Sequence, residues 1–345
     1  MKIITLFNNK GGVSKTTTTF HLGWKLASQG NRVLIVDADP QCNLTQLVLE
    51  GQSPEDESID VESLLNNRNL YTALDPVYNG RPQKLTPVDC LQVNGCEGLY
   101  LLPGHSGLAE YESTLGIAQQ LSETLGPVRN IPGSFRHLIK ITAKKYRIDY
   151  TLIDVSPSLG AMNQNIVTSS DRLILPLNPD VFCVQAITSM RNVLPKWVDW
   201  AHRAANVEAL QSADYPFEGT EIKFLGNIVQ RFRLRNNKPT SAFKTYFKRL
   251  DSAIIDHLIP KFSECGLLLS EDQYHKAHMS KNYRLETIPE FNTLIAASQA
   301  SGKPVFALEQ DDTGHTGTVW RNDEQKINEI DEIFTTLANR VADLS

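Results

Sequence analysis

A loop rich in glycine and lysine near the start of the chain is the clearest sign of chemistry in this sequence. The apolar run IITLF (3–7) leads directly into NNKGGVSKTT (8–17), a pattern typical of a buried strand, a loop and the first turn of a helix. Free backbone N–H groups and the positive end of the helix dipole bind phosphate at such a junction. Lys15 is expected to reach the β- and γ-phosphates of a nucleotide, and the Thr16 hydroxyl to ligate Mg²⁺.

This loop departs from the common phosphate-loop pattern at two positions and adds a charge at a third. The pattern places glycine at 9 and 14, where this chain has Asn9 and Ser14. The N–H of Ser14 should face the β-phosphate, and a side chain there narrows the available space. Lys10 adds a positive charge beside a triphosphate, either its own or one bound by a facing subunit. The alternative is a turn that binds no ligand.

Carboxylates follow two further apolar runs. VLIV (33–36) precedes Asp37 and Asp39, and TLI (151–153) precedes Asp154. Continuous apolar runs of this kind are typical of parallel strands that are buried on both faces. Ligands of open α/β sheets lie at the carboxyl ends of the strands, so we expect these acids near the phosphate loop. Asp154 would then hold Mg²⁺ as a Walker-B aspartate does.

Together these segments resemble the ParA/Soj family of deviant Walker A partition ATPases. KGGVSKTT (10–17) resembles that family's phosphate loop, and DADPQCNLT (37–45) resembles its D-x-D-P-Q-G-N-x-T element, with Cys42 in place of glycine. IDVSPSLG (153–160) is similar to the family's I-D-x-P-P-S-L-G segment, with Ser156 in place of the first proline. Weaker similarity continues at 99–104, 173–179, 288–289 and 301–305.

The resemblance implies roles for individual residues and two cofactors, ATP and Mg²⁺. Lys10 would cross to the partner's nucleotide in a homodimer that encloses two ATP molecules, and Asp39 would position or activate the attacking water. Thr45 would lie in the segment that senses the γ-phosphate, with Asp37 as a companion. The implied catalytic residues are Lys10, Lys15 and Asp39. The implied metal site comprises Thr16, Asp39 and Asp154. The implied nucleotide-binding residues are Lys10, Gly11, Gly12, Val13, Ser14, Lys15, Thr16, Thr17, Pro176 and Asn178.

Alternating apolar segments predict an α/β fold, a mostly parallel twisted β-sheet flanked by helices on both faces, of the P-loop NTPase type with a deviant Walker A loop. Strands are expected at about 2–8, 33–37, 99–102, 150–155, 172–176 and 222–230. Helices are expected at about 15–29, 106–125, 134–145, 161–169, 183–205, 241–258 and 323–343. Pro195 should kink or break the helix that contains it.

We expect one P-loop ATPase domain over residues 1–345. Residues 50–98 are polar and acidic at first, which favours a mobile insertion, and extra helical segments are expected at about 201–220 and 250–285. The last helix has apolar residues at helical spacing and an acidic polar face, so it should pack back on the sheet. A membrane-targeting helix would instead be basic on its polar face.

The charge distribution suggests one basic surface on an acidic protein. The net charge is −5, yet residues 223–249 contain eight basic residues and no acidic one. Such a surface, doubled in a dimer, would suit the phosphates of non-specific DNA. Some of these arginines could instead contact nucleotide, and the loop that carries Arg231 and Arg235 is expected near the base. The candidate DNA-binding residues are Arg231, Arg233, Arg235, Lys238, Lys244 and Lys248.

We expect a cytoplasmic protein from the composition, and the family resemblance implies association with the nucleoid. No apolar stretch approaches the length of a membrane span, and the early first strand leaves no room for a signal peptide or an N-terminal helix-turn-helix module. The five cysteines show no CxxC spacing, which argues against a zinc or iron–sulfur site.

Three functions compete. The first is a ParA-like ATPase that dimerises on ATP, binds DNA non-specifically and partitions plasmid, chromosome or other cargo. A ParB-like adaptor would stimulate its slow hydrolysis. The second is a related ATP-dependent metabolic enzyme, against which stands the 37–45 element. The third is a Min-type membrane-positioning ATPase, against which stands the acidic last helix.

Overall fold

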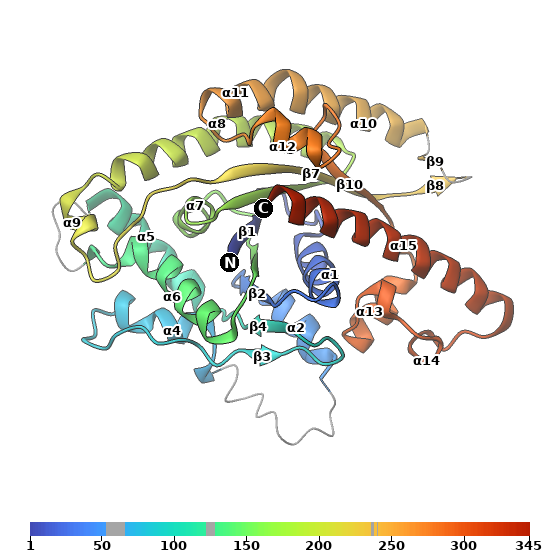
Figure 1. The fold of residues 1–345 in the computed structure, drawn as a ribbon, viewed down its shortest axis with the longest axis horizontal. Helices are drawn as coiled ribbons and strands as arrows, with labels where there is room; N and C mark the ends of the chain where they lie inside the picture. Colours follow the sequence, from blue (N-terminus) through green and yellow to red (C-terminus); the bar gives the residue numbers. More distant parts are fainter. Residues whose placement is uncertain (53–65, 122–127, 236–237, 240) are drawn as a thin grey trace.

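An eight-stranded sheet forms the centre of the molecule (Figure 1). The computed structural model describes residues 1–52, 66–121, 128–235, 238–239 and 241–345. The strands lie in the order β10-β7-β6-β1-β5-β2-β4-β3. Their bounds are β1 (Lys2–Leu6), β2 (Val33–Ala38), β3 (Leu91–Gln92), β4 (Leu99–Leu102), β5 (Tyr150–Val155), β6 (Arg172–Leu177), β7 (Lys223–Phe232) and β10 (Arg284–Pro289). A separate hairpin pairs β8 (Leu234–Arg235) with β9 (Lys238–Pro239).

The sheet is parallel except at one edge, where β3 pairs antiparallel with β4. The strand β1 lies between β5 and β6, and the connections that follow the strands on its two sides lead in opposite directions across the sheet. This topological switch point is where open α/β sheets bind ligands. The prediction of a mostly parallel sheet is therefore confirmed, and the phosphate loop follows its central strand.

Helices cover both faces of the sheet, as predicted. The first face carries α1 (Lys15–Ser28), α2 (Asn43–Glu50), α12 (Glu271–Lys276), α13 (Leu294–Ser301) and α15 (Gly317–Leu344). The second face carries α4 (Leu70–Tyr78), α5 (Leu108–Leu121), α6 (Ile131–Tyr146), α7 (Ala161–Thr168), α8 (Val181–Ala204), α10 (Ser241–Ser252) and α11 (Ile259–Glu264). Shorter elements are α9 (Glu208–Gln211), the π-helix η2 (Ala253–Leu258), the 3₁₀-helix η3 (Val305–Ala307) and α14 (Gln310–Thr313).

Each face of the sheet has its own apolar core. Phe20, Leu22 and Trp24 of α1 pack with Phe334 and Leu337 of α15 on the first face. Figure 1 shows these two helices side by side, on the opposite side of the sheet from α5, α6 and α7. The last helix therefore packs back on the fold, as its apolar spacing predicts.

Two helix predictions differ from the structure. Of the predicted kink or break at Pro195, the break does not occur: α8 continues through Pro195, because Leu194 and Trp197 on either side are buried and Trp197 packs 5.4 Å from Phe7 between ring centroids. The helix expected to end near 258 passes from α10 through η2 into α11. The predicted end of the 106–125 helix falls on residues 122–127, which lie outside the described part of the chain.

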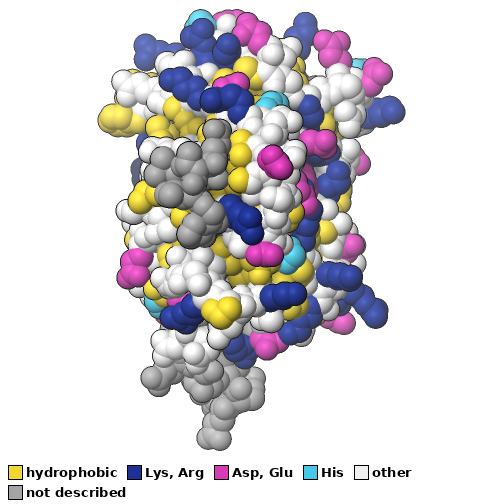
Figure 2. Space-filling view, turned by 90° about the vertical axis from the view of Figure 1, so that its left-hand side faces the viewer, with side chains coloured by type: hydrophobic (Ala, Val, Ile, Leu, Met, Phe, Trp, Pro, Cys, Tyr) yellow, Lys and Arg dark blue, Asp and Glu magenta, His cyan; other side chains and the backbone are white. Residues whose placement is uncertain are grey.

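Charges of both signs share the surface at the left-hand side of Figure 1, where Lys and Arg lie among Asp and Glu (Figure 2). Among the described helices, none combines the length and the apolar character needed to span a membrane.

Candidate nucleotide-binding site

The phosphate loop is held in place by Asn8, which lies two residues beyond the end of β1 and is fully buried. The Asn8 Nδ2 donates to the carbonyl oxygen of Pro176 at 2.7 Å, and its Oδ1 accepts from the N–H of Lys10 at 2.9 Å. The loop is thus tied to β6 before it turns into α1. Asn178 adds a second tie from the same strand end, because its Nδ2 donates to the carbonyl oxygen of Gly12 at 3.0 Å.

Two residues next to the loop take the left-handed backbone conformation that favours glycine. Ser14 has φ 55° immediately before α1, and Cys42 has φ 55° immediately before α2. These are positions where the family pattern has glycine. A non-glycine residue in this conformation costs of order 1–3 kcal/mol unless its surroundings impose it. Ser14 and Cys42 therefore keep the backbone conformation that glycine would adopt, but they adopt it at a higher free energy.

Lys15 is a buried cation beside a large cavity. Its side chain contacts the carbonyl oxygen of Asn8 through Nζ at 3.3 Å, and the residue is only 7% exposed. Burial lowers the pKa of Lys15, while the charges of Asp154 and Asp39 oppose that shift. No ion pair among the described residues includes Lys15. A further anion at this site would stabilise the charged form of Lys15, and a phosphate is such an anion.

Thr16 and Asp154 form a site that fits a divalent cation. The Thr16 Oγ1 donates to Asp154 Oδ2 at 2.6 Å, which joins the first turn of α1 to the end of β5. The other carboxylate oxygen, Asp154 Oδ1, is buried and has no hydrogen-bond partner. Burial raises the pKa of Asp154, and the nearby Asp37 charge raises it further. Hard oxygen ligands around an unsatisfied carboxylate suit Mg²⁺.

Asp37 and Thr45 form a structural connection instead of facing the cavity. The Thr45 N–H and Oγ1 donate to Asp37 Oδ2 at 2.8 and 2.7 Å, and Thr45 Oγ1 accepts from the N–H of Gly104 at 2.9 Å. Burial raises the pKa of Asp37 to about 6, although the Thr45 hydrogen bonds oppose the shift. Thr45 was expected to lie in the segment that senses the γ-phosphate, and its hydroxyl in this structure is buried and bonded to Asp37 and Gly104.

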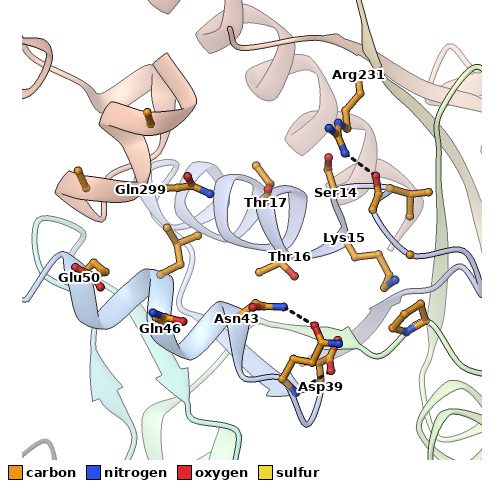
Figure 3. A pocket seen from close by; sticks show the side chains of 18 residues that line it. Ser14, Lys15, Thr16, Thr17, Asp39, Asn43, Gln46, Glu50, Arg231 and Gln299 are labelled. Carbon is orange, nitrogen blue, oxygen red and sulfur yellow. Dashed lines mark hydrogen bonds between the residues drawn. The ribbon is translucent and has the colours of Figure 1, made fainter. Parts of the chain in front are cut away.

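A cavity of about 810 Å³ opens in front of the phosphate loop (Figure 3). Its lining includes loop residues, Asp39 and side chains of α2 and α13. The Asp39 Oδ1 accepts from the N–H of Gln41 at 3.0 Å, which fixes the carboxylate at the cavity wall. In Figure 3, Asp39 and Arg231 lie on opposite sides of Lys15. The loop residues in the lining are Gly11, Gly12, Val13, Ser14, Lys15, Thr16 and Thr17.

A second cavity of about 450 Å³ adjoins the first and shares Ser14, Thr17, Arg231 and Gln299 with it. The segment 288–292 lines this second cavity. Its size and position suit the base of a nucleotide whose phosphates occupy the first cavity.

Pro176 and Asn178 do not line either cavity, so the structure does not place them beside a base. The Pro176 carbonyl and the Asn178 amide bond the phosphate loop instead. The end of β7 and the segment 288–292 lie beside the smaller cavity instead.

Lys10 is held within its own chain. Its Nζ forms an ion pair with Asp180 and lies 5.5 Å from the ring centroid of Phe182. Asp180 also caps α8, because its Oδ1 accepts from the N–H of Cys183 at 2.9 Å. Three apolar side chains in the segments that follow β5 and β6 are exposed, namely Leu159, Val181 and Phe182.

The four basic candidates whose side chains are described make different contacts. Arg231 bonds the phosphate loop, and Arg233 forms an ion pair with Glu290 at 2.9 Å. Lys244 and Lys248 are exposed one turn apart on α10. Arg235 pairs with Lys238 through the backbone of the β8–β9 hairpin, and their side chains lie outside the described part.

Sequence reasoning missed Asn8 and Asp180 as residues that position the site, and it left Arg231 undecided. Their partners lie 168, 170 and 219 residues away in the chain. Local spacing carries no signal of such distant pairs, although the family pattern could have drawn attention to Asn8 as the residue between strand and loop.

Comparisons with known proteins agree on the kind of domain. A family model described as an AAA domain matches residues 1–204. The sporulation initiation inhibitor protein Soj of Bacillus subtilis is 32% identical over 193 residues, which cover 56% of this chain and 64% of Soj, less than two thirds of that relative.

Two solved structures share the fold over most of the chain. The protein DIP2308 from Corynebacterium diphtheriae is 26% identical with a TM-score of 0.58, and the match covers 88% of this chain and 97% of that protein. A variant of McdA from Cyanothece, solved in complex with ATP, is 17% identical with a TM-score of 0.52, and the match covers 96% and 97%.

Proposed function

This chain belongs to the ParA/Soj family of P-loop ATPases, and we propose that it binds ATP with Mg²⁺ and hydrolyses it slowly as a homodimer. One observation carries the proposal. The buried Lys15 side chain faces a cavity of about 810 Å³ and forms no ion pair among the described residues, and beside it the Thr16–Asp154 pair has a carboxylate oxygen without a hydrogen-bond partner.

Each residue has a defined task in this proposal. The backbone of Gly11, Gly12 and Ser14 surrounds the phosphates, and Lys15 neutralises them. Thr16 and Asp154 would hold Mg²⁺, which neutralises the charge that spreads over the transferred phosphoryl group. Asp39 positions the attacking water from the side of the cavity that lies opposite Arg231 (Figure 3). The Asp39 carboxylate would also contribute to the Mg²⁺ site.

Dimerisation would complete the site. Lys10 would leave Asp180 and reach the nucleotide of the partner, which makes hydrolysis conditional on association. The exposed Leu159, Val181 and Phe182 support this step, because they follow β5 and β6, the two strands that flank β1, and exposed apolar side chains there favour a protein interface.

We further propose that the dimer binds DNA non-specifically through α10 and the carboxyl ends of β7 and β10, and so associates with the nucleoid. In this proposal a ParB-like adaptor stimulates hydrolysis, and the protein positions its cargo through that adaptor. Exposed Lys244 and Lys248 support the DNA contact.

Calorimetry with Mg²⁺–ATP and sedimentation with and without nucleotide test the proposal. Wild-type protein should release or absorb heat on binding and shift from monomer to dimer. Lys15→Ala should abolish binding, and Asp39→Ala should bind ATP and accumulate as a dimer. Normal hydrolysis by Asp39→Ala would remove the water-positioning role, and wild-type protein that shows neither binding nor association would refute the function.

A further inference from the structure

Arg231 occupies an irregular position near the end of β7. Its neighbours Gln230 and Phe232 pair with the successive residues Ile288 and Pro289 of β10, so Arg231 itself has no partner in the ladder. Its φ is 58°, in the left-handed region that disfavours a residue with a side chain. A bulge of this kind redirects a side chain, and such conformations gather at functional sites.

The bulge directs Arg231 to the phosphate loop (Figure 3). The Arg231 Nη1 donates to the carbonyl oxygen of Gly12 at 2.8 Å. A Cβ on Gly12 would lie 3.8 Å from that same nitrogen, in ordinary contact, and the Gly12 φ of 71° already favours glycine there. The guanidinium therefore rests directly against the loop that surrounds the phosphates.

The remaining donors of Arg231 lie where two cavities meet. Arg231 lines both the cavity in front of the loop and the smaller one beside it. No ion pair among the described residues includes Arg231, and a guanidinium has five N–H donors, of which the Gly12 bond uses one. A planar set of donors is well suited to phosphate oxygens.

We propose that Arg231 binds the phosphate chain of the nucleotide held by its own protomer, where that chain passes from the loop toward the base. This inference rests on the proposed function and assigns Arg231 to the nucleotide and not to DNA. Arg233 differs, since it is paired with Glu290.

The variant Arg231→Gly tests the proposal without a penalty to the fold, because glycine suits a φ of 58°. Arg147→Gly is the matched control. Arg147 is an exposed arginine with a φ of 53° at the end of α6, so it loses the same charge and the same strain away from the cavities. Thermal unfolding without nucleotide checks stability, and Arg231→Gln replaces the glycine variant if that variant is less stable than wild type.

Calorimetry with Mg²⁺–ATP and Mg²⁺–ADP measures the effect. Arg231→Gly should raise both dissociation constants at least tenfold, Arg231→Lys should recover part of the loss, and Arg147→Gly should match wild type. DNA retention at saturating ATP should be the same for Arg231→Gly and wild type.

Unchanged ATP affinity in Arg231→Gly together with weaker DNA retention would overturn the inference and return Arg231 to the DNA surface. Unchanged affinity and unchanged retention would also overturn it. Wild-type protein that binds no ATP would instead refute the proposed function, so the two failures are distinguishable.

Discussion

Two residues near the phosphate loop adopt a backbone conformation for which the family pattern has glycine. Ser14 and Cys42 both have φ 55°, and each immediately precedes a helix beside the cavity. Burial raises the pKa of Cys42 to about 12, so its thiol stays protonated near neutral pH. The sequence pattern identified both replacements of glycine. Only the structure shows that each replacement places a residue with a side chain in the left-handed backbone conformation, which costs free energy.

Ser14→Gly should raise the free energy of unfolding by up to about 1 kcal/mol, because the relief of the left-handed conformation exceeds the added entropy of glycine in the unfolded chain. Ser28→Gly, at the last position of α1, should have the opposite sign, since glycine is a poor helix residue. Chemical denaturation without nucleotide measures both. A less stable Ser14→Gly would mean that the Ser14 side chain contributes more than its strain costs.

Residue roles were predictable where the chemistry is local. The loop of residues 8–17 and the acids at 37, 39 and 154 are recognisable because strand, ligand residue and helix are contiguous. The burial of Thr45 was not predictable, because its hydroxyl accepts from Gly104, 59 residues away. The same limit applies to Lys10 and Asp180.

At the scale of elements, His21 joins the phosphate-binding helix to the C-terminal segment. Its Nδ1 bonds the Thr17 carbonyl oxygen at 2.8 Å, and its Nε2 accepts from the N–H of Val305 at 3.0 Å. The ring packs against Phe291, Phe306 and Phe334. Phe291 also lines the smaller cavity, so His21 links α1 to the wall of the proposed base site.

This link should make the fold sensitive to acid. Burial lowers the pKa of His21 from 6.5 to about 3, so the unfolded chain takes up a proton that the folded chain refuses. Stability from this group is present above pH 6.5 and is lost as the pH falls toward 3. One such proton amounts to about 1.4 kcal/mol per pH unit, or about 2 kcal/mol between pH 6.5 and 5.

Denaturation at pH 7 and pH 5 tests the effect with His21→Gln, whose amide does not titrate. The variant should be less stable than wild type at pH 7, but its loss between the two pH values should be smaller by about 2 kcal/mol. His257→Gln, at an exposed position in η2, should keep the wild-type pH dependence. Equal slopes for His21→Gln and wild type would contradict a neutral buried His21.

The sequence predicted the strands that are continuous apolar runs, and it missed a strand in which charged and apolar residues are mixed. The strands β1, β2 and β5 are apolar runs buried on both faces, which makes them easy to recognise. The strand β10 alternates poorly, with Arg284 and Glu286 in six residues, and its pairing with β7 is not local. Pro195 was expected to disrupt α8, but burial of the residues around it outweighs the loss of about 3 kcal/mol that such a proline causes.

At the scale of the whole molecule, a net charge of −5 makes DNA binding depend on how the charges are arranged. The α10 lysines offer a direct test. Lys244→Glu with Lys248→Glu should weaken ATP-dependent DNA retention and reduce the slope of log K against log salt by about 2, one for each lost phosphate contact. ATP binding should remain, and the double change Lys144→Glu with Lys145→Glu on α6 should leave retention nearly unchanged. Retention equal to wild type in the α10 variant would remove this helix from the DNA surface.

The ion pair between Lys10 and Asp180 connects the monomer to the proposed dimer. If Lys10 must leave Asp180 to reach the partner's nucleotide, the pair opposes association, and two such pairs break per dimer. The side chains are 21% and 34% exposed, so each pair contributes at most about 1 kcal/mol. Asp180→Asn removes the charge and keeps a residue that caps α8 well.

Asp180→Asn should therefore lower the dissociation constant of the ATP-bound dimer by about tenfold, within the range that two pairs of about 0.5–1 kcal/mol allow. Sedimentation with a slowly hydrolysed ATP analogue measures this constant. Asp199→Asn breaks an exposed pair with Arg203 on the same helix and should match wild type. The double variant Lys10→Ala with Asp180→Asn should lose the gain. Weaker association of Asp180→Asn would mean that Asp180 orients Lys10 toward the partner instead of restraining it.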